Sequence, residues 1–176
     1  MNTNYVISVI TRDKPGIIEQ LSKVINEHQG NWLASNFCRL SGQFAGIVEF
    51  SCPSEESVNV LNALESLSSP DFQLSVAKGE SQGEQNTNVV QLEIMGNDKQ
   101  GIIKEISRIL ASHHVNLLKL SSSCESAPNW GSLLFKAQAE IEIPKDLDLD
   151  DLTESLEEIA NDLVVEVNLS SNSSQQ

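Results

Sequence analysis

The chain has 176 residues, of which 39% are apolar, and its 11 Lys and Arg against 25 Asp and Glu give a formal net charge of −14. This composition is typical of a globular protein and argues against a disordered chain. The basic residues are scattered, so we expect no direct binding to nucleic acid or to an anionic membrane, both of which require a basic patch. The sequence shows no secretion signal and no apolar run near the ~20 residues of a membrane span. Three cysteines without a disulfide or zinc spacing agree with a cytoplasmic protein.

One sequence pattern occurs twice in the chain, at an offset of 85 residues. Asp13–Ile18 aligns with Asp98–Ile103, and nine of 29 ungapped positions from Tyr5/Val90 to Leu33/Leu118 are identical. The repeat predicts two copies of one domain. We place them at residues 1–78 and 89–170, joined by a polar linker at 79–88 and followed by a flexible tail at 171–176.

The first copy predicts six elements in chain order. A strand at Tyr5–Thr11 precedes a helix that has Pro15 in its first turn, an apolar stripe, and Gly30 as a left-handed stop. Two strands at Asn31–Leu40 and Gln43–Cys52 follow, with a tight turn at Ser41-Gly42. A second helix is expected to start at Pro53–Glu56, and its apolar stripe comprises Val58, Leu61, Leu64 and Leu67. The closing strand alternates through Phe72, Leu74 and Val76.

The second copy predicts the same order of elements. The loop Glu125–Gly131 replaces the tight turn, and the second helix has the apolar stripe Leu152, Leu156, Ile159 and Leu163. This β-α-β-β-α-β order predicts an α+β protein of two tandem ferredoxin-like domains, each an antiparallel sheet with both helices on one face. The other face is left bare, so we expect a second domain or a second chain to cover it or to extend the sheet edge, as in a homodimer.

The loop between the first strand and the first helix of each copy is the candidate ligand site. Gly16 and Gly101 allow a ligand to approach the backbone. The N–H groups of the first helical turn, at Ile17 and Ile102, are free to bind a carboxylate.

Polar side chains flank both loops. Asp13 and Asp98 can accept from a ligand ammonium or can cap their own helices. Asn31 and Asn116 open the next strands, where each serves as a ligand donor and acceptor or as a turn residue. We expect a small zwitterion such as an amino acid to bind between the domains. We also expect the first copy to be the better site because it retains Pro15 and Gly30.

Other constellations indicate no catalysis. His28 and His113 match across the repeat, which favours a shared structural role over a metal or catalytic one. We expect no cofactor and no metal. The acidic stretch Glu140–Glu166 is either a solvated face or a docking surface for a basic protein.

The motif Asp13–Ile18, its helix and Asn31 opening a strand resemble the ACT domain, a small regulatory module that commonly binds amino acids. The second copy departs from the motif at Gln100, where proline is usual, and at Val115, which replaces Gly30. A chain of two such modules with no enzyme attached resembles the glycine cleavage system transcriptional repressor family.

This resemblance implies a non-enzymatic repressor of glycine cleavage genes. It would bind glycine or a similar amino acid and act through a protein partner, a DNA-binding transcriptional activator, rather than on DNA. Two alternatives remain: a regulatory subunit or allosteric partner of an amino-acid metabolic enzyme, and an assembly module without a ligand.

Overall fold

The computed structural model describes residues 1–80, 87–126 and 132–171. The chain divides into two units, Met1–Gly83 and Glu84–Gln176. Most of the expected linker, most of the expected Glu125–Gly131 loop and nearly all of the expected tail therefore lie outside the described residues. The first strand of the second unit begins at Thr87, within the range expected for the linker.

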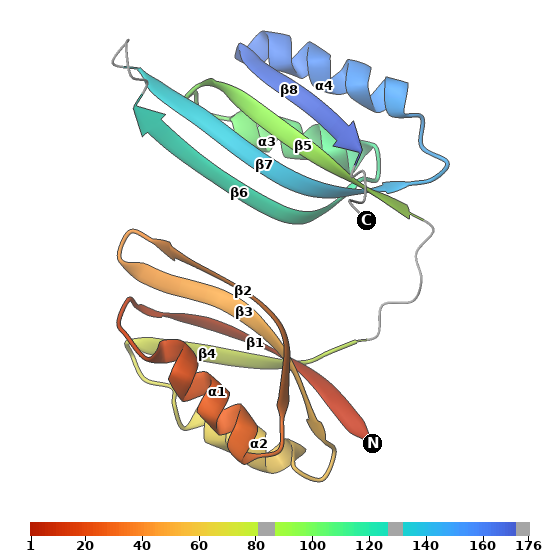
Figure 1. Cartoon of the computed structure of the whole chain (residues 1–176). Coiled ribbons are helices and arrows are strands. Elements are labelled where there is room, and N and C mark those ends of the chain that lie inside the picture. The colour runs from red at the N-terminus through yellow and green to blue at the C-terminus, as the bar shows by residue number, and fades with distance from the viewer. Residues whose placement is uncertain (81–86, 127–131, 172–176) are drawn as a thin grey trace. The chain divides into compact units, whose positions relative to one another are not determined.

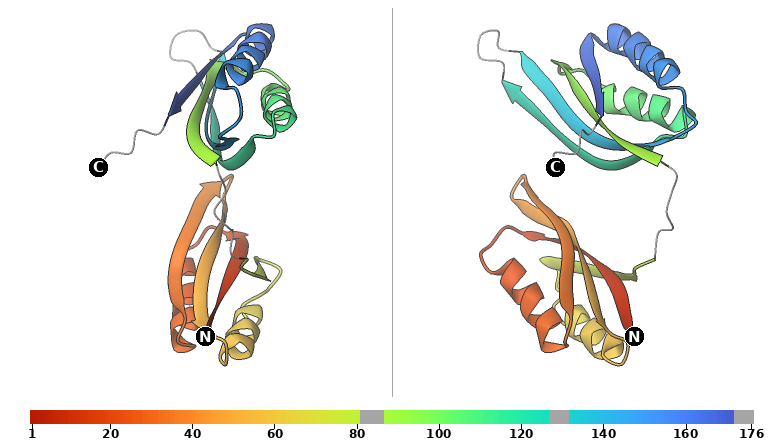
Figure 2. Two further views of the ribbon diagram at one scale, coloured as in Figure 1. Left: turned by 90° about the vertical axis from the view of Figure 1, so that its right-hand side faces the viewer. Right: turned by 45° about the vertical axis from the view of Figure 1, so that its right-hand side comes forward.

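The first unit has the predicted β-α-β-β-α-β order. Its elements are β1 (Asn2–Arg12), α1 (Ile17–Glu27), β2 (Asn31–Leu40), β3 (Gln43–Pro53), α2 (Ser57–Glu65) and β4 (Phe72–Lys78). The strands form one antiparallel sheet in the order β2-β3-β1-β4, and both helices cover one of its faces (Figures 1 and 2).

The second unit repeats this architecture. Its elements are β5 (Thr87–Asn97), α3 (Ile102–Ser112), β6 (Asn116–Ser126), β7 (Leu133–Pro144), α4 (Leu149–Leu163) and β8 (Val165–Ser171). The antiparallel sheet has the order β6-β7-β5-β8, again with both helices on one face (Figure 1). The predicted tandem ferredoxin-like fold is confirmed in both units.

Each unit has its own apolar core between helices and sheet. Alternating strand residues point into it, because successive side chains of a strand lie on opposite faces. In the first unit the largest fully buried side chains include Ile7, Leu21, Ile25, Val48, Phe50 and Leu64, and in the second unit Leu92, Ile141, Leu152 and Leu156. The turn at Ser41-Gly42 has φ of 49° and 77°, the positive values of a type I′ hairpin turn.

The first helix of each unit ends in a Schellman motif, and here the expectation for Gly30 is wrong. The left-handed residue is Gln29 in the first unit and His114 in the second, at φ of 57° and 56°. In both units the next N–H closes the motif: Gly30 donates to the Ile25 carbonyl at 2.8 Å and Val115 to Leu110 at 2.9 Å. The two helix stops are equivalent although one has valine in place of glycine.

The second helix of the first unit begins later than expected. Pro53 still belongs to β3 and is paired with Asn2, and the Ser54 N–H donates to the Met1 carbonyl at 3.0 Å. The helix starts only at Ser57, so Val60 and Leu64 form its buried face. Val58, expected in the stripe, is 67% exposed.

Candidate ligand-binding site

The β1–α1 and β5–α3 loops have nearly identical backbones. Gly16 is the N-cap of α1 at φ 90°, ψ 2°, and Gly101 is the N-cap of α3 at φ 99°, ψ 0°. Side chains rarely adopt a φ of this size, so both positions require glycine for their conformation. A Cβ at either glycine would meet no protein atom within 4 Å and would project into the open space above the helix end.

Neither α1 nor α3 has a side-chain hydrogen bond at its N-cap. Asp13 and Asp98 therefore do not cap their helices. The first main-chain bonds of the helices run from Gln20 to the Gly16 carbonyl and from Glu105 to the Gly101 carbonyl, both at 3.0 Å. The main-chain N–H groups of the first turn, which come before Gln20 and Glu105, have no acceptor within their own helix. Such groups bind an anion at a helix N-terminus.

We expected Pro15 in the first turn of the helix, but it lies two residues before the first helical residue. Pro15 lies in the loop, one residue before the N-cap, and Ile17 is the first helical residue. Gln100 occupies the equivalent position without changing the loop geometry. Proline at this place is therefore not what shapes the loop.

A depression of about 320 Å³ opens at the first loop. It is lined by Asp13, Lys14, Gly16, Ile17, Ile18, Glu19 and Phe44. The structure thus brings Asp13, Gly16 and Ile17 to one hollow, with acidic and basic side chains at its rim.

The aspartates of the two loops face different partners. The Asp13 carboxylate pairs with the Arg39 guanidinium at 3.1 Å, from the end of β2. The position equivalent to Arg39 is Cys124 in β6. Desolvation, then the charge of Asp98 and a hydrogen bond to it, raise the pKa of the Cys124 thiol. Asp98 therefore faces a neutral thiol, and among the described residues no cation lies within ion-pair distance of it.

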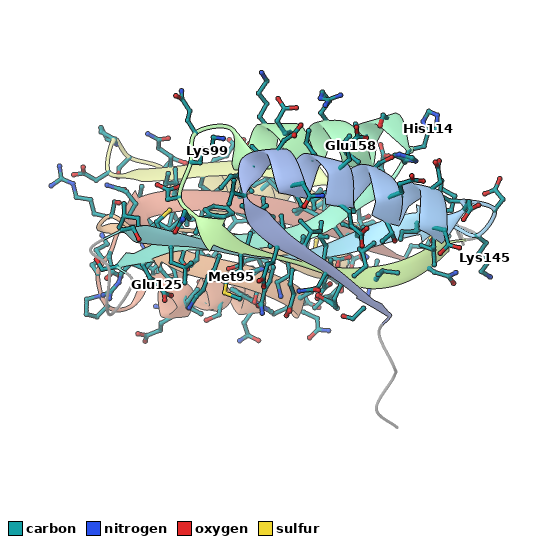
Figure 3. All side chains as sticks on the ribbon, turned by 90° about the horizontal axis from the view of Figure 1, so that it is seen from above. Met95, Lys99, His114, Glu125, Lys145 and Glu158 are labelled. Atoms are coloured by element: carbon teal, nitrogen blue, oxygen red, sulfur yellow. The ribbon has the colours of Figure 1, made fainter. Side chains whose placement is uncertain are left out.

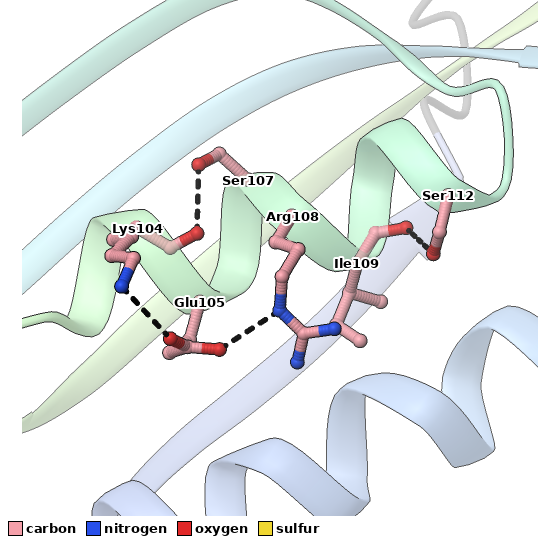
Figure 4. Close-up of polar contacts among 6 residues, drawn as sticks. All are labelled: Lys104, Glu105, Ser107, Arg108, Ile109 and Ser112. Atoms are coloured by element: carbon pink, nitrogen blue, oxygen red, sulfur yellow. Dashed lines mark hydrogen bonds and ion pairs between the residues drawn. The ribbon is translucent and has the colours of Figure 1, made fainter.

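The charge in the first helical turn also differs. Glu19 in α1 corresponds to Lys104 in α3. The neighbouring Glu105 carboxylate accepts from the Arg108 Nε at 3.0 Å, and its other oxygen lies 3.9 Å from the Lys104 Nζ (Figure 4). The second loop is thus the more positive at its helix end, and its aspartate faces a thiol where that of the first loop faces a guanidinium.

The asparagines lie far from the glycine loops of their own domains. Asn31 is paired with Ser51, which is paired with Asn4, so Asn31 lies at the opposite end of the sheet from Asp13. The ten residues of β2 span about 30 Å at about 3.3 Å each. Asn116 has the equivalent place and donates to the Glu142 carboxylate at 3.3 Å. Within one domain, a single small ligand cannot reach both ends.

Comparison with known proteins identifies the first of these domains. The family model described as ACT domain matches residues 3–76, which include the Asp13–Ile18 loop. The first domain resembles the ACT domain over nearly its whole length. The second domain repeats its topology and its loop backbone, so the chain is a tandem of ACT-like domains.

Two solved structures match over nearly the full length of the chain. An unknown protein from Galdieria sulphuraria is 26% identical, with 97% of this chain and 99% of that chain covered and a TM-score of 0.87. A candidate glycine cleavage system transcriptional repressor is 18% identical, with 98% and 99% covered and a TM-score of 0.67, which shows a common fold. No curated protein matches the chain significantly. None of the helices among the described residues is long and apolar enough to cross a membrane.

Sequence reasoning missed the side chains that distinguish the two ACT-like loops. Arg39 and Cys124 come from the second strand, and they reach the loop because the β2–β3 and β6–β7 hairpins end beside it. The Asp13 N–H donates to the Gly42 carbonyl at 3.1 Å, which fixes that hairpin end against the loop. The 85-residue offset already aligns Glu19 with Lys104, and extending it beyond Leu33 would have aligned Arg39 with Cys124.

The matched histidines join the two helices of each ACT-like domain. The His28 Nδ1 lies 3.4 Å from the Glu56 carboxylate at the start of α2. The His113 Nε2 lies 3.1 Å from the Ser155 hydroxyl of α4, and its Nδ1 lies 3.6 Å from Asp151. These contacts support the expected structural role. Within the described part of the chain, no group of three His, Cys, Asp or Glu is placed to hold a metal ion.

Proposed function

We propose that the chain is a non-enzymatic regulator that responds to a small amino acid such as glycine. The ACT assignment of residues 3–76 supports this class of ligand. The two loops offer free N–H groups for a carboxylate, with Asp13 or Asp98 beside them for an ammonium. The main support is Asp98, an exposed carboxylate next to a helix end that no cation of the described residues approaches within ion-pair distance.

The second loop is the stronger site in this proposal, contrary to the ranking expected from the sequence. That ranking relied on Pro15 and Gly30, but both loops and both helix stops have the same backbone. The charges differ instead. Asp13 is already neutralised by Arg39, whereas Asp98 is free to accept from an ammonium. Lys104 favours a ligand carboxylate at its helix end, while Glu19 at the first loop repels one.

Isothermal titration with glycine and other small amino acids tests this site. Asp98→Asn should weaken binding about 10- to 150-fold, the worth of a hydrogen bond to a charged group at about 1.5–3 kcal/mol. Asp13→Asn is the matched control in the paired copy and should change the affinity little. Equal losses in the two variants, or none in Asp98→Asn, contradict the ranking. Absence of any amino-acid binding contradicts the site.

Gly16→Val is a poor probe of the same site. A side chain there would occupy ligand space, but a φ of 90° also strains any residue other than glycine. Loss of binding in that variant would mix occlusion with a distorted helix start. The aspartate substitutions leave the backbone unchanged.

The finer proposal is repression of glycine cleavage genes through a protein partner. The similarity in fold to the candidate glycine cleavage system transcriptional repressor extends over both whole chains and supports it. The net charge of −14 favours docking on a basic protein over contact with DNA. Asn31 and Asn116 remain proposed ligand residues for the strand ends, separate from the glycine loops.

Co-purification from the native host, with and without added glycine, tests the partner. Recovery of a DNA-binding activator in a glycine-dependent amount supports the repressor. Recovery of an amino-acid metabolic enzyme instead would indicate a regulatory subunit of that enzyme.

A further inference from the structure

A hollow of about 520 Å³ lies at one corner of the second domain, where α4 passes into β8. It is enclosed by Met95–Asn97 of β5, Leu134 of β7, the end of α4 and Val164–Glu166. Met95 lies at this end of α4 (Figure 3). We call this hollow the α4 corner. Its volume is in the range of small-ligand and side-chain pockets.

The α4 corner combines an apolar wall with a negative end. Met95 and Val164 contribute apolar surface, at 43% and 69% exposed. Glu166 is paired with Met95, so its carboxylate lies on the same face of the sheet. The last carbonyls of α4 add partial negative charge, because they form the negative pole of the helix. Such a lining suits a long side chain with an apolar stem and a cationic head.

Helix α4 strengthens this negative potential. It has six carboxylates and no basic residue: Asp150, Asp151, Glu154, Glu157, Glu158 and Asp162. Among the described residues, neither these carboxylates nor Glu166 lie within ion-pair distance of a lysine or an arginine, and Asp151 contacts His113. The equivalent helix of the first domain, α2, contains one carboxylate. The negative charge is therefore a property of the second domain and not of the repeat.

A lysine of the chain itself shows that this helix end accepts a cation. The Lys99 Nζ, from the β5–α3 loop, lies 3.5 Å from the main-chain carbonyl of Asp162 (Figure 3). Lysines near a helix C-terminus commonly donate to its last carbonyls. Lys99 does not line the α4 corner, so a second cation can reach Glu166.

The same corner of the first domain contains a guanidinium. The Arg12 Nε lies 3.3 Å from the Asp71 carboxylate, next to the start of β4. The 85-residue offset aligns Arg12 with Asn97, which lines the α4 corner. The fold thus has a place for an arginine beside a carboxylate at this corner. In the second domain the carboxylate is Glu166, and an arginine there would have to come from another chain.

We propose that the α4 corner binds an arginine side chain from a basic segment of a protein partner. The stem lies against Met95, Leu134 and Val164, and the guanidinium bridges Glu166 and the last carbonyls of α4. Arginine fits better than lysine because its planar, weakly hydrated head can donate to two acceptors at once. This inference rests on the proposed protein partner and names the chemistry by which the chain would recognise it.

An NMR titration of the isotope-labelled full chain tests the α4 corner without the partner. The probe is a capped tripeptide with one arginine between two glycines, taken to millimolar concentration because a single side chain binds weakly. Main-chain amide signals of Asn97, Asn161 and Glu166 should shift and saturate. The same tripeptide with citrulline, which has the shape of arginine without its charge, should leave them unchanged. Equal shifts with citrulline, or shifts spread evenly over the acidic residues, overturn the proposal.

Two variants with matched controls locate the contact. Glu166→Gln should weaken binding of the arginine tripeptide on the order of fivefold. Glu154→Gln removes the same charge from the outer face of α4 and should change the affinity little. Asn97→Arg should abolish binding, because it supplies the guanidinium that Arg12 supplies in the first domain. Asn88→Arg adds the same charge at the other end of β5 and should leave binding nearly unchanged.

The outcome is distinguishable from failure of the proposed function. Equal effects in a variant and its control would mean that the tripeptide follows net charge, and the α4 corner would be wrong. Glycine is absent from this titration, and so is the partner. A negative result therefore removes the α4 corner alone, while the amino-acid titration and the co-purification decide the ligand and the partner.

Discussion

At the scale of single residues, His28 and Glu56 show how a repeated side chain holds a domain together. Glu56 accepts from the Asn59 amide at 3.1 Å and lies 3.4 Å from the His28 ring, so one carboxylate joins the end of α1 to the start of α2. These hydrogen bonds, that of Asn59 first, lower the pKa of Glu56 below its ordinary 4.5. A carboxyl with a lowered pKa in the folded state stabilises the fold wherever it is ionised.

This sign predicts an acid-dependent effect of Glu56→Gln. The stabilisation by Glu56 is complete above pH 4.5 and is lost as the pH falls through the lower folded-state pKa. The variant should melt at a lower temperature than the unaltered chain at pH 7, and the difference should shrink in acid. Glu55→Gln, at an exposed neighbour, is the control. Thermal denaturation followed by circular dichroism measures both, and a pH-independent difference would contradict the assignment.

At the scale of elements, the end of α4 contains a residue in a conformation that does not suit it. Val164 is the C-cap at φ 58°, ψ 47°, and it is 69% exposed. A β-branched side chain is disfavoured in this left-handed region by about 1–2 kcal/mol, whereas glycine adopts it freely. No burial of Val164 offsets the strain.

Val164→Gly should therefore stabilise the second domain. We expect a net gain of about 1 kcal/mol once the greater freedom of glycine in the unfolded chain is subtracted, or about 4–8 °C in the melting temperature. Val58→Gly is the control, because Val58 is 67% exposed but lies within α2, where glycine is unfavourable. A melting temperature lowered by Val164→Gly would mean that the valine makes contacts that outweigh its conformation.

The elements also show where sequence patterns predict structure and where they do not. Alternation placed Phe72 in the core, and Ser41-Gly42 predicted the tight turn, because both signals are local. The start of α2 was wrong because Pro53 is paired with Asn2, a partner distant in sequence. The glycine loops were found through the repeat, but the contrast of Arg39 with Cys124 depends on where a hairpin ends. That position is set by strand register rather than by local sequence.

At the scale of the whole molecule, two separate cores share one chain of strongly negative charge. The buried cluster of each domain draws only on its own strands and helices. The formal net charge of the chain is −14, and the basic residues form no patch in the sequence. A surface of this kind repels a phosphate backbone over most of its area.

The chain alone should not retard DNA in a gel at physiological salt. The expectation follows from the charge and is checked by a mobility shift with increasing protein. In a second assay the co-purified partner is added, and any retardation of the DNA should then depend on that partner. Tight, salt-sensitive retardation by the isolated chain would contradict regulation through a protein.

The shared backbone of the two glycine loops has a consequence for how this molecule evolves. Gly16 and Gly101 fix the helix starts, while the side chains that set the local charge, Arg39 and Glu19 or Cys124 and Lys104, are all exposed. Substitutions at those four positions change what a loop attracts at little cost to folding, since exposed sites away from special contacts tolerate change. After a duplication, the two copies could therefore specialise for different molecules by surface mutation alone, under continued selection for one common scaffold.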